Sequence, residues 1–247
     1  MRVLLLGGTT EASLLARALA GSGIDGVFSY AGRTDAPLPQ PMLLRIGGFG
    51  GVAGLTGWLR AEAITHIVDA THPFAAAIST NALAAAAACA LPLIALERPP
   101  WQPQPGDQWT HVPDYSTAAA ALPRAPARVF LAIGKQNLAA FAARPQHHYL
   151  LRLVDAPVNP ALAGADVVLA RGPFTFDSDR ALLLRHRITH LVAKNSGGAG
   201  AEAKIVAARE LALPVILIAR PALPPRRVAA TVAEVLDFLH AGTDRGV

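Results

Sequence analysis

Short hydrophobic runs alternate with segments of helical spacing along most of this chain. In the first half, the pattern predicts strands over 2–6, 27–30, 42–46, 66–69 and 93–96, and helices over 11–21, 51–61 and 74–90. In the second half, it predicts strands over 129–133, 149–153, 166–170, 190–193 and 215–218, and helices over 135–143, 178–186, 202–211 and 228–240. Continuous apolar runs that end near glycine are typical of buried parallel strands. The pattern therefore predicts an α/β protein with parallel sheets.

The same pattern occurs twice. Residues 2–8 resemble 128–134, residues 64–68 resemble 188–192, and residues 90–92 resemble 212–214, at offsets of 126, 124 and 122. Matches in the same order with a slowly drifting offset indicate two copies of one unit. We therefore predict two tandem Rossmann-like halves with a ligand cleft between them.

A proline-rich passage over 98–106 separates the copies. Prolines at this density do not continue a helix or a central strand, so the passage is expected to be a linker. The predicted organisation is a first domain of residues 1–100, a linker of residues 101–107 and a second domain of residues 108–247.

The composition is that of a packed globule, because 52% of the 247 residues are hydrophobic and only 16% are charged. No apolar run reaches the roughly 18 to 20 residues of a membrane span, so no membrane association is expected. The chain starts directly with a predicted core strand, which argues against a signal peptide and for a cytoplasmic protein. Cys89 is the single cysteine, which excludes an internal disulfide, and we expect it to be a small buried hydrophobe. The histidine spacing predicts no metal site.

The formal net charge of +5 favours an anionic ligand. Nucleic acid is one class of anionic partner, but its grooves combine a basic stripe with stacking aromatic rings. Here the arginines are scattered and aromatic residues make up only 6% of the chain. An acidic small molecule therefore fits the sequence better than a nucleic acid does.

The first predicted strand is followed by Gly7, Gly8, Thr9, Thr10 and Glu11. Glycines at a strand-to-helix turn let the backbone approach a ligand, and the free N–H groups at a helix start attract phosphate. The pattern is not G-x-G-x-x-G, so the standard dinucleotide fingerprint is absent. Glycines that serve only a tight turn are the alternative, and the two threonines favour phosphate binding.

The second predicted strand ends at Tyr30, and Arg33 follows shortly after it. In dinucleotide sites an acid at this place accepts from the ribose of NAD, whereas an arginine suits the 2′-phosphate of NADP. No acid ends this strand, so Arg33 predicts a preference for NADPH. A solvent-exposed loop arginine is the alternative.

Two further loops follow predicted strands. Gly47, Gly48, Phe49, Gly50 and Gly51 form a loop in which four glycines would permit close approach of a ligand and expose the edge of one aromatic ring. The fourth strand is followed by a polar cluster that contains Thr71, His72, Pro73 and Phe74. His72 would either donate to a substrate or cofactor, or cap the next helix.

Lysine is rare, with Lys135, Lys194 and Lys204 against nineteen arginines. Lys135 follows the repeat glycine Gly134, and Lys194 opens the segment Asn195, Ser196, Gly197 at the end of a strand. Lysines confined to such places indicate sites that need a compact or titratable ammonium, with coincidental surface lysines as the alternative. Arg171, after another strand of the second half, adds a further donor to anions.

Together, residues 6–12, 47–51, 69–75 and 194–198 resemble the precorrin-6A reductase family of cobalamin biosynthesis, and the resemblance extends from the first strand to Pro221. The resemblance implies NADPH-dependent reduction of one carbon–carbon double bond of precorrin-6A, giving precorrin-6B. It also implies that the first domain binds NADPH and that the second domain binds a tetrapyrrole with many carboxylate arms.

In this interpretation the residues from Gly7 to Glu11, Tyr30, Arg33, the 47–51 loop and Thr71 to Phe74 bind the cofactor. Lys135, Arg171 and Lys194 to Gly197 bind the substrate, and Lys204, Lys194 or His72 supplies the proton. Other readings remain open. They are a different NADPH-dependent reductase of an acidic small molecule, a non-catalytic NADPH-binding protein and a basic nucleic-acid module.

Overall fold

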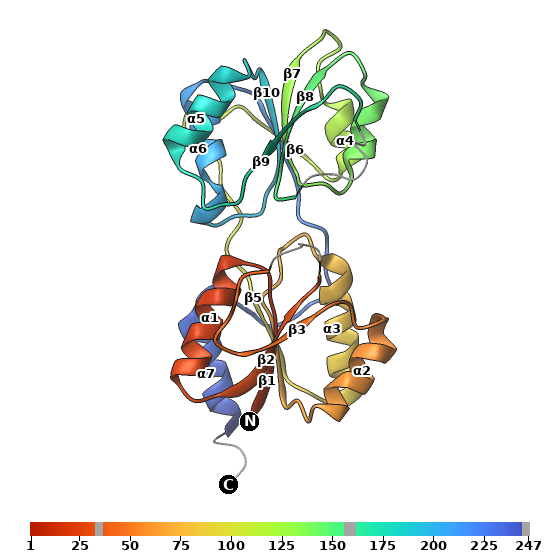
Figure 1. The fold of residues 1–247 in the computed structure, drawn as a ribbon, viewed down its shortest axis with the longest axis vertical. Coiled ribbons are helices and arrows are strands. Elements are labelled where there is room, and N and C mark those ends of the chain that lie inside the picture. The colour runs from red at the N-terminus through yellow and green to blue at the C-terminus, as the bar shows by residue number, and fades with distance from the viewer. Residues whose placement is uncertain (33–36, 156–161, 244–247) are drawn as a thin grey trace. The chain divides into compact units, whose positions relative to one another are not determined.

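The computed structural model describes residues 1–32, 37–155 and 162–243, and the chain divides into two compact units. Unit 1 combines residues 1–99 with 221–247, and unit 2 is residues 100–220. Each unit holds a six-stranded sheet in which all paired strands are parallel, with helices on both faces (Figure 1). The predicted α/β class with two Rossmann-like sheets is confirmed.

Unit 1 has the strand order β12-β5-β4-β1-β2-β3. Its strands are β1 (Arg2–Leu6), β2 (Asp25–Tyr30), β3 (Leu43–Ile46), β4 (His66–Asp69), β5 (Leu93–Leu96) and β12 (Val228–Ala229). Its helices are α1 (Thr10–Gly21), α2 (Gly51–Ala61), α3 (Ala76–Cys89) and α7 (Val232–Thr243). With β12 counted as the sixth strand, this is the 3-2-1-4-5-6 order of dinucleotide-binding folds.

Unit 2 has the order β6-β11-β10-β7-β8-β9, which matches unit 1 position by position. Its strands are β6 (Trp109–Val112), β7 (Arg128–Ala132), β8 (His148–Leu153), β9 (Asp166–Leu169), β10 (His190–Lys194) and β11 (Val215–Ile218). Its helices are α4 (Tyr115–Ala120), α5 (Phe176–Arg185), α6 (Ala203–Glu210) and the 3₁₀ helices η1 (Leu138–Ala143) and η2 (Ala199–Ala201). Where the first copy has the regular helix α1, the second has only η1.

The two copies of the repeat exchange their last strand and helix. β6 and α4 follow the first copy in sequence but belong to unit 2, where α4 packs on η1. β12 and α7 follow the second copy but complete unit 1, where Val228 pairs with Ala95 and α7 packs on α1. The structure therefore differs from the predicted second domain of residues 108–247, because residues 221–247 belong to the first unit.

The predicted linker of residues 101–107 also belongs to unit 2. Trp101 is only 7% exposed and lies in the hydrophobic core of that unit. The chain passes between the units at two points, residues 99–100 and 220–221. Prolines occupy three of these four positions, which is consistent with connections that form neither helix nor strand.

The core of unit 1 lies on both faces of its sheet. Val3 and Leu5 pack with α1 and α7, whereas Leu4 and Leu6 pack with α2 and α3. Side chains alternate between faces along a strand, so one leucine-rich run fills both layers. Figure 1 shows α1 and α7 on one face and α2 and α3 on the other. None of the helices in the described ranges is long and apolar enough to cross a membrane.

Candidate functional site

The loops that follow β1, β4 and β5 meet at the carboxyl edge of the unit 1 sheet. They surround a hollow too small to admit a water molecule, lined by Thr9, Glu11, Thr71, Pro73, Leu96, Glu97 and Arg98. Ligands of open α/β sheets bind outside the carboxyl ends of the strands. Four residues predicted to bind the cofactor, namely Thr9, Glu11, Thr71 and Pro73, are thus brought together here.

Thr9 is the N-cap of α1. Its Oγ1 accepts a hydrogen bond from the Ala12 N–H at 3.1 Å and donates one to the Ala70 carbonyl at 2.8 Å. The hydroxyl therefore joins the helix start to the end of β4, which is a different use from the phosphate donor that the sequence predicted. The N–H groups of Thr10 and Glu11, at the first two helical positions, have no acceptor within an α-helix and remain suited to an anion.

Gly7 and Gly8 are glycines for different reasons. A Cβ on Gly7 would lie 2.1 Å from Cζ of Phe28, so this position is fixed by packing inside the unit. Gly8 has φ +118, and a Cβ there would have no atom within 4 Å. The open space beside Gly8 leaves the backbone there accessible to a ligand.

Glu11, in the first turn of α1, forms an ion pair with Arg98 at 2.5 Å. The two side chains are 25% and 15% exposed, so the pair is largely enclosed. Arg98 directly precedes the passage of the chain into unit 2. The sequence placed Glu11 at the cofactor, and the structure adds that Glu11 anchors the end of β5 to α1.

Asp69, the last residue of β4, is 5% exposed, and its Oδ1 accepts hydrogen bonds from the Thr71 N–H at 3.1 Å and Thr71 Oγ1 at 2.7 Å. The Phe74 N–H donates to His72 Nδ1 at 3.2 Å, so a neutral His72 carries its proton on Nε2. The N-cap of α3 is Ala75, without any side-chain cap. Helix capping by His72 is therefore wrong, and its role as a hydrogen-bond donor stays a prediction.

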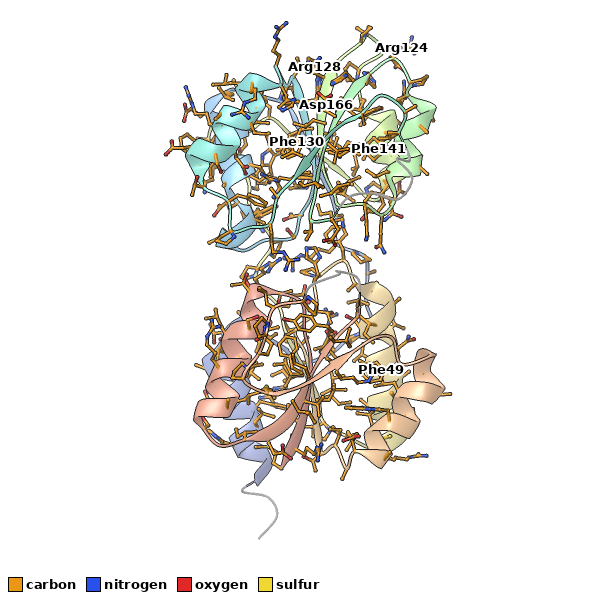
Figure 2. All side chains as sticks on the ribbon, in the orientation of Figure 1. Phe49, Arg124, Arg128, Phe130, Phe141 and Asp166 are labelled. Atoms are coloured by element: carbon orange, nitrogen blue, oxygen red, sulfur yellow. The ribbon has the colours of Figure 1, made fainter. Side chains whose placement is uncertain are left out.

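Arg45, at the end of β3, organises the 47–51 loop, and the sequence analysis did not identify it. Its guanidinium donates to the Gly47 carbonyl at 2.6 Å and the Gly48 carbonyl at 2.8 Å, and lies 3.6 Å from the ring centroid of Phe49. Burial lowers the pKa of the Arg45 guanidinium from its ordinary value. The Phe49 ring, labelled in Figure 2, is packed against Arg45 and Trp58, although the sequence suggested a free ring edge.

Tyr30 also has local partners. Its hydroxyl donates to the Leu38 carbonyl at 2.9 Å and accepts from Gln40 Nε2 at 2.7 Å, and its ring lies 4.7 Å from that of Phe28. The tyrosine therefore holds the end of β2 against the loop that leads to β3. Arg33, predicted to bind a 2′-phosphate, lies outside the described residues.

In unit 2, the turn after β7 differs from its counterpart after β1. Gly134, with φ +78, precedes the exposed Lys135, and η1 begins after Asn137, which has φ 64 and no capping side chain. A 3₁₀ helix without a cap lacks the regular row of free N–H groups that α1 offers. The exposed ammonium of Lys135 thus lies in unit 2 at the position where the N-terminus of α1 lies in unit 1.

Asn195 clamps the backbone of Trp101. Its Oδ1 accepts from the Trp101 N–H at 2.8 Å, and its Nδ2 donates to the Trp101 carbonyl at 3.2 Å. The indole Nε1 also donates to the Gly198 carbonyl at 3.3 Å. The side-chain amide of Asn195, predicted to bind substrate, is therefore committed to the segment that enters unit 2.

Lys204 is buried against the same tryptophan. Lys204 is only 5% exposed. Its Nζ lies 4.8 Å from the Trp101 ring centroid and donates a hydrogen bond to the Ala201 carbonyl. These contacts are those of an ammonium that holds α6 and Trp101 together. Lys194, at the end of β10, is more accessible than Lys204.

The remaining predicted residues of unit 2 lie at the carboxyl edge of its sheet. Ser196 and Gly197 are buried, and Arg220 donates to the carbonyls of Asn195 at 2.9 Å and Ser196 at 3.1 Å. Arg171 is exposed after β9. Ser196 and Gly197 thus shape this loop, while Arg171, Lys135 and Lys194 present charge.

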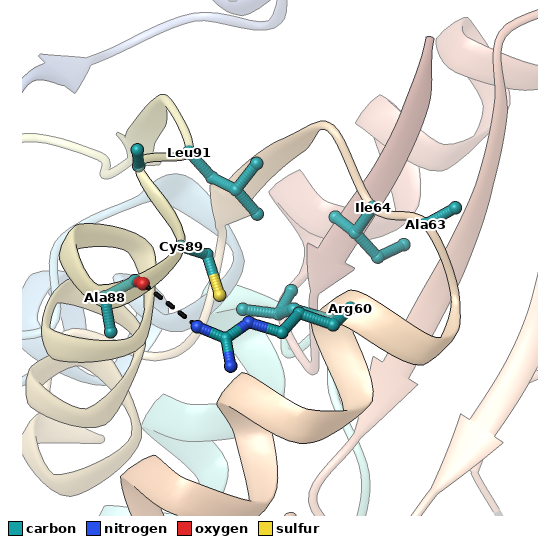
Figure 3. Close-up of a pocket in the computed structure, with 8 residues that line it drawn as sticks. Arg60, Ala63, Ile64, Ala88, Cys89 and Leu91 are labelled. Carbon is teal, nitrogen blue, oxygen red and sulfur yellow. Dashed lines mark hydrogen bonds between the residues drawn. The ribbon is translucent and has the colours of Figure 1, made fainter.

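A second hollow in unit 1 lies between the ends of α2 and α3, at the opposite edge of the sheet from the candidate site. It is lined by Leu59, Arg60, Ala63, Ile64, Ala88, Cys89, Ala90 and Leu91. Arg60 donates to the Ala88 carbonyl at 3.3 Å across it (Figure 3). Cys89 is a half-buried thiol, and no convergent set of polar groups marks a ligand site. The ranges that the structure describes hold no group of side chains suited to a metal ion.

Comparison with known proteins connects these features to one family. The family model described as "Precorrin-6x reductase CbiJ/CobK" matches residues 2–240. The chain belongs to this family. The resemblance seen in the sequence is therefore confirmed.

Individual relatives match over 91% or more of their own length. A precorrin-6A reductase of Rhodobacter capsulatus is 62% identical over 249 residues, covering 100% of this chain and 99% of the relative. A precorrin-6A reductase of Rhodococcus erythropolis is 47% identical, covering 91% of each. A solved structure, "CobK precorrin-6A reductase", aligns with TM-score 0.95 and 62% identity over 98% of this chain and 96% of that one.

Proposed function

We propose that this member of the precorrin-6x reductase family uses NADPH to reduce one carbon–carbon double bond of precorrin-6A, giving precorrin-6B. The observation that carries the proposal is the asymmetry of two units that share one sheet topology. One unit keeps the features of a nucleotide site, and the other carries the charge that suits a polycarboxylate.

The nucleotide features belong to unit 1. A capped α-helix follows β1, Gly8 leaves open space beside the backbone, and Thr10 is exposed in the first turn. In unit 2 the equivalent helix is the uncapped η1. The positive end of a regular helix favours phosphate, so unit 1 is the proposed NADPH-binding unit.

The positive net charge of the chain comes from unit 2. Its residues include thirteen Lys and Arg against eight Asp and Glu, a balance of +5, whereas unit 1 has nine of each. All three lysines are among the thirteen. A tetrapyrrole with many carboxylate arms, as the family implies, would find its charge-assisted partners there, each contributing about 1.5–3 kcal/mol.

The residues present fit a nicotinamide dinucleotide. Gly8, the first N–H groups of α1 and the 47–51 loop would hold phosphate groups, while Thr71 and the segment from His72 to Phe74 would lie beneath the nicotinamide. The reduced nicotinamide supplies a hydride, and the protein orients it and balances charge. Arg33 is the proposed partner of the 2′-phosphate.

The second hydrogen that the product gains is a proton. We propose Lys194 or the Nε2–H of His72 as its source, because both lie at the carboxyl edge of a sheet, Lys194 as the last residue of β10 and His72 in the loop after β4. Lys204 was also predicted for this role, but its ammonium is buried between Trp101 and the Ala201 carbonyl. We assign Lys204 to positioning Trp101 and α6.

The comparisons favour the metal-free substrate. Relatives named precorrin-6A reductase are 45% to 62% identical to this chain, whereas the relative named cobalt-precorrin-6A reductase from Priestia megaterium is 32% identical. We therefore propose precorrin-6A without cobalt as the preferred substrate.

The direct test is incubation of the purified protein with NADPH and precorrin-6A, followed through the absorbance of NADPH and of the macrocycle. One NADPH should be consumed for each macrocycle reduced, and cobalt-precorrin-6A should react more slowly. Tight NADPH binding without turnover of either tetrapyrrole would instead identify a non-catalytic binding protein.

The choice of cofactor is tested with Arg33→Ala. Loss of the guanidinium should raise KM for NADPH by about tenfold or more, since one charge-assisted contact is lost, and leave KM for NADH nearly unchanged. Steady-state kinetics with both cofactors measures the difference. Equal effects on the two cofactors would remove the 2′-phosphate role of Arg33.

A further inference from the structure

The 47–51 loop of unit 1 and the 170–175 loop of unit 2 share an arrangement that the sequence repeat does not show. Phe49 precedes α2 by two residues, and Phe174 precedes α5 by two residues. An arginine guanidinium lies 3.6 Å from the ring centroid in each case, Arg45 over Phe49 and Arg152 over Phe174. The two arginines come from strands that are not equivalent in the repeat, because β8 corresponds to β2 and Arg45 lies on β3. The same arginine–phenylalanine stack is therefore formed from different positions of the sheet.

The charge of the two arginines is balanced differently. Arg152 forms an ion pair with Asp179, and both side chains are at most 9% exposed. Arg45 has no ion pair within the described residues, and its two nitrogens instead bond the Gly47 and Gly48 carbonyls. In unit 2 the stacked arginine is therefore paired with a carboxylate, while in unit 1 the stacked arginine donates hydrogen bonds to the backbone carbonyls of the loop.

These carbonyl contacts set the direction of the loop amides. In a trans peptide the C=O and the N–H point in opposite directions. Because the Gly47 and Gly48 oxygens point at Arg45, the N–H groups of Gly48 and Phe49 point away from it. A Cβ on Gly47, Gly48, Gly50 or Gly51 would meet no atom within 4 Å, so glycine side-chain packing does not hold this backbone. It is held by Arg45, by the hydrogen bond from the Gly47 N–H to the Tyr30 carbonyl at 2.9 Å, and by the Phe49 ring against Trp58.

We propose that Arg45 is a positioning residue for the cofactor, fixing the 47–51 loop so that its amides receive an anionic oxygen of the dinucleotide. The inference rests on the proposed function and names a residue of the same site. Arg45 acts through the loop and not by its charge alone, since both of its bonding nitrogens and its ring-facing surface are engaged by the loop itself.

Binding of NADP⁺ to Arg45→Met and Arg45→Lys tests the proposal by calorimetry. A lysine keeps the charge but has no planar guanidinium that could bond the Gly47 and Gly48 carbonyls and stack on the Phe49 ring at the same time. Both variants should therefore bind about tenfold more weakly, and KM for NADPH should rise far more than kcat falls. Arg60→Met is the matched control. Arg60 lies in the last turn of α2, at the opposite end of that helix from the 47–51 loop, and donates to the Ala88 carbonyl of α3.

A second readout needs no cofactor. The Gly47 N–H donates to the Tyr30 carbonyl at 2.9 Å, and its amide hydrogen exchange should be faster in both Arg45 variants than in the wild-type protein and in Arg60→Met. If Arg45→Met does not fold, Phe49→Leu removes the stack and should give the same loss of protection with a smaller loss of affinity.

The outcomes separate this inference from the proposed function. Wild-type affinity in Arg45→Lys beside a weakened Arg45→Met would show that charge alone acts, and it would overturn the positioning role. Unchanged affinity and exchange in both variants would also overturn it. A wild-type protein that binds no NADP⁺ would refute the proposed function, while unaltered exchange in the variants would refute the loop-fixing role itself.

Discussion

At the residue scale, the adjacent Gly7 and Gly8 show how packing and ligand access can be told apart. Gly7 leaves room for the Phe28 ring, and Gly8 combines a positive φ with open space. A substitution at either position should lower stability, but only a substitution at Gly8 should also affect ligand access.

Gly7→Ala should lower the free energy of unfolding by about 1–3 kcal/mol, because Phe28 must move to make room for the methyl group. Gly8→Ala should also lower the free energy of unfolding, because an alanine at φ +118 is strained. Of the two variants it alone should weaken NADPH binding, since its methyl group would stand in the open space proposed for the ligand. Chemical denaturation and calorimetric titration of both variants measure the two effects. If Gly8→Ala bound NADPH as well as the wild type does, the cofactor would not approach the backbone there.

Residue-scale prediction from the sequence works from chain neighbours. The polar cluster after β4 and the glycines after β1 were singled out because each follows directly on a buried strand, and their roles in binding stay predictions. The roles of Asn195, Lys204 and Arg45 were not found, because Trp101 and the Gly47 and Gly48 carbonyls become their partners only through folding. The one available signal for Arg45 was an arginine two residues before a glycine loop with a phenylalanine.

At the element scale, β4 and β10 begin with the same hydrogen bond, between a threonine hydroxyl and the ring of the histidine that follows it. Thr65 Oγ1 lies 2.9 Å from Nδ1 of His66, and Thr189 Oγ1 lies 3.0 Å from Nδ1 of His190. Each threonine also exchanges hydrogen bonds with the backbone of the strand alongside, at Arg2 or Arg128. Burial lowers the pKa of both histidines from the ordinary value of 6.5.

This lowering predicts a loss of stability in mild acid. Below pH 6.5 the unfolded chain binds protons that the folded histidines resist, so the free energy of unfolding falls as the pH decreases toward their folded pKa values. The double variant His66→Gln/His190→Gln should show a shallower fall over this range, measured by denaturation at several pH values. His111→Gln serves as the control, and an unchanged slope in the double variant would contradict the assignment.

Ten strands were predicted from the sequence within one or two residues, because buried parallel strands are continuous apolar runs. The strands β6 and β12 were missed, since both are short edge strands beside proline-rich segments. A helix was expected over 135–143, where the structure has the shorter η1, and α4 was not expected at all. Pairing between distant segments is not encoded in local periodicity, so the exchange of β6 and β12 was not predictable.

At the scale of the whole molecule, the exchange makes unit 2 continuous in sequence and unit 1 discontinuous. Residues 100–220 contain every strand and helix of unit 2, whereas residues 1–99 lack β12 and α7. Val235 and Leu239 of α7 are fully buried in the core of unit 1, so this core is incomplete without them.

Residues 100–220 expressed alone should fold cooperatively, and residues 1–99 alone should not. A chain that joins 1–99 to 221–247 through a short linker should recover cooperative unfolding, because it restores β12 and the α7 layer. Circular dichroism and thermal unfolding of the three proteins test this. Cooperative folding of 1–99 by itself would show that the exchanged strand and helix are dispensable.

The exchange also sets the order in which the chain can mature during synthesis. Domains usually fold in the order in which they leave the ribosome. Here every residue of unit 2 has been made before β12 and α7 are translated, so the unit that starts the chain is the last to be finished. A ribosome that stalls after residue 220 would therefore display a finished second unit and an amino-terminal unit in which α1 alone covers the sheet face that α1 and α7 share.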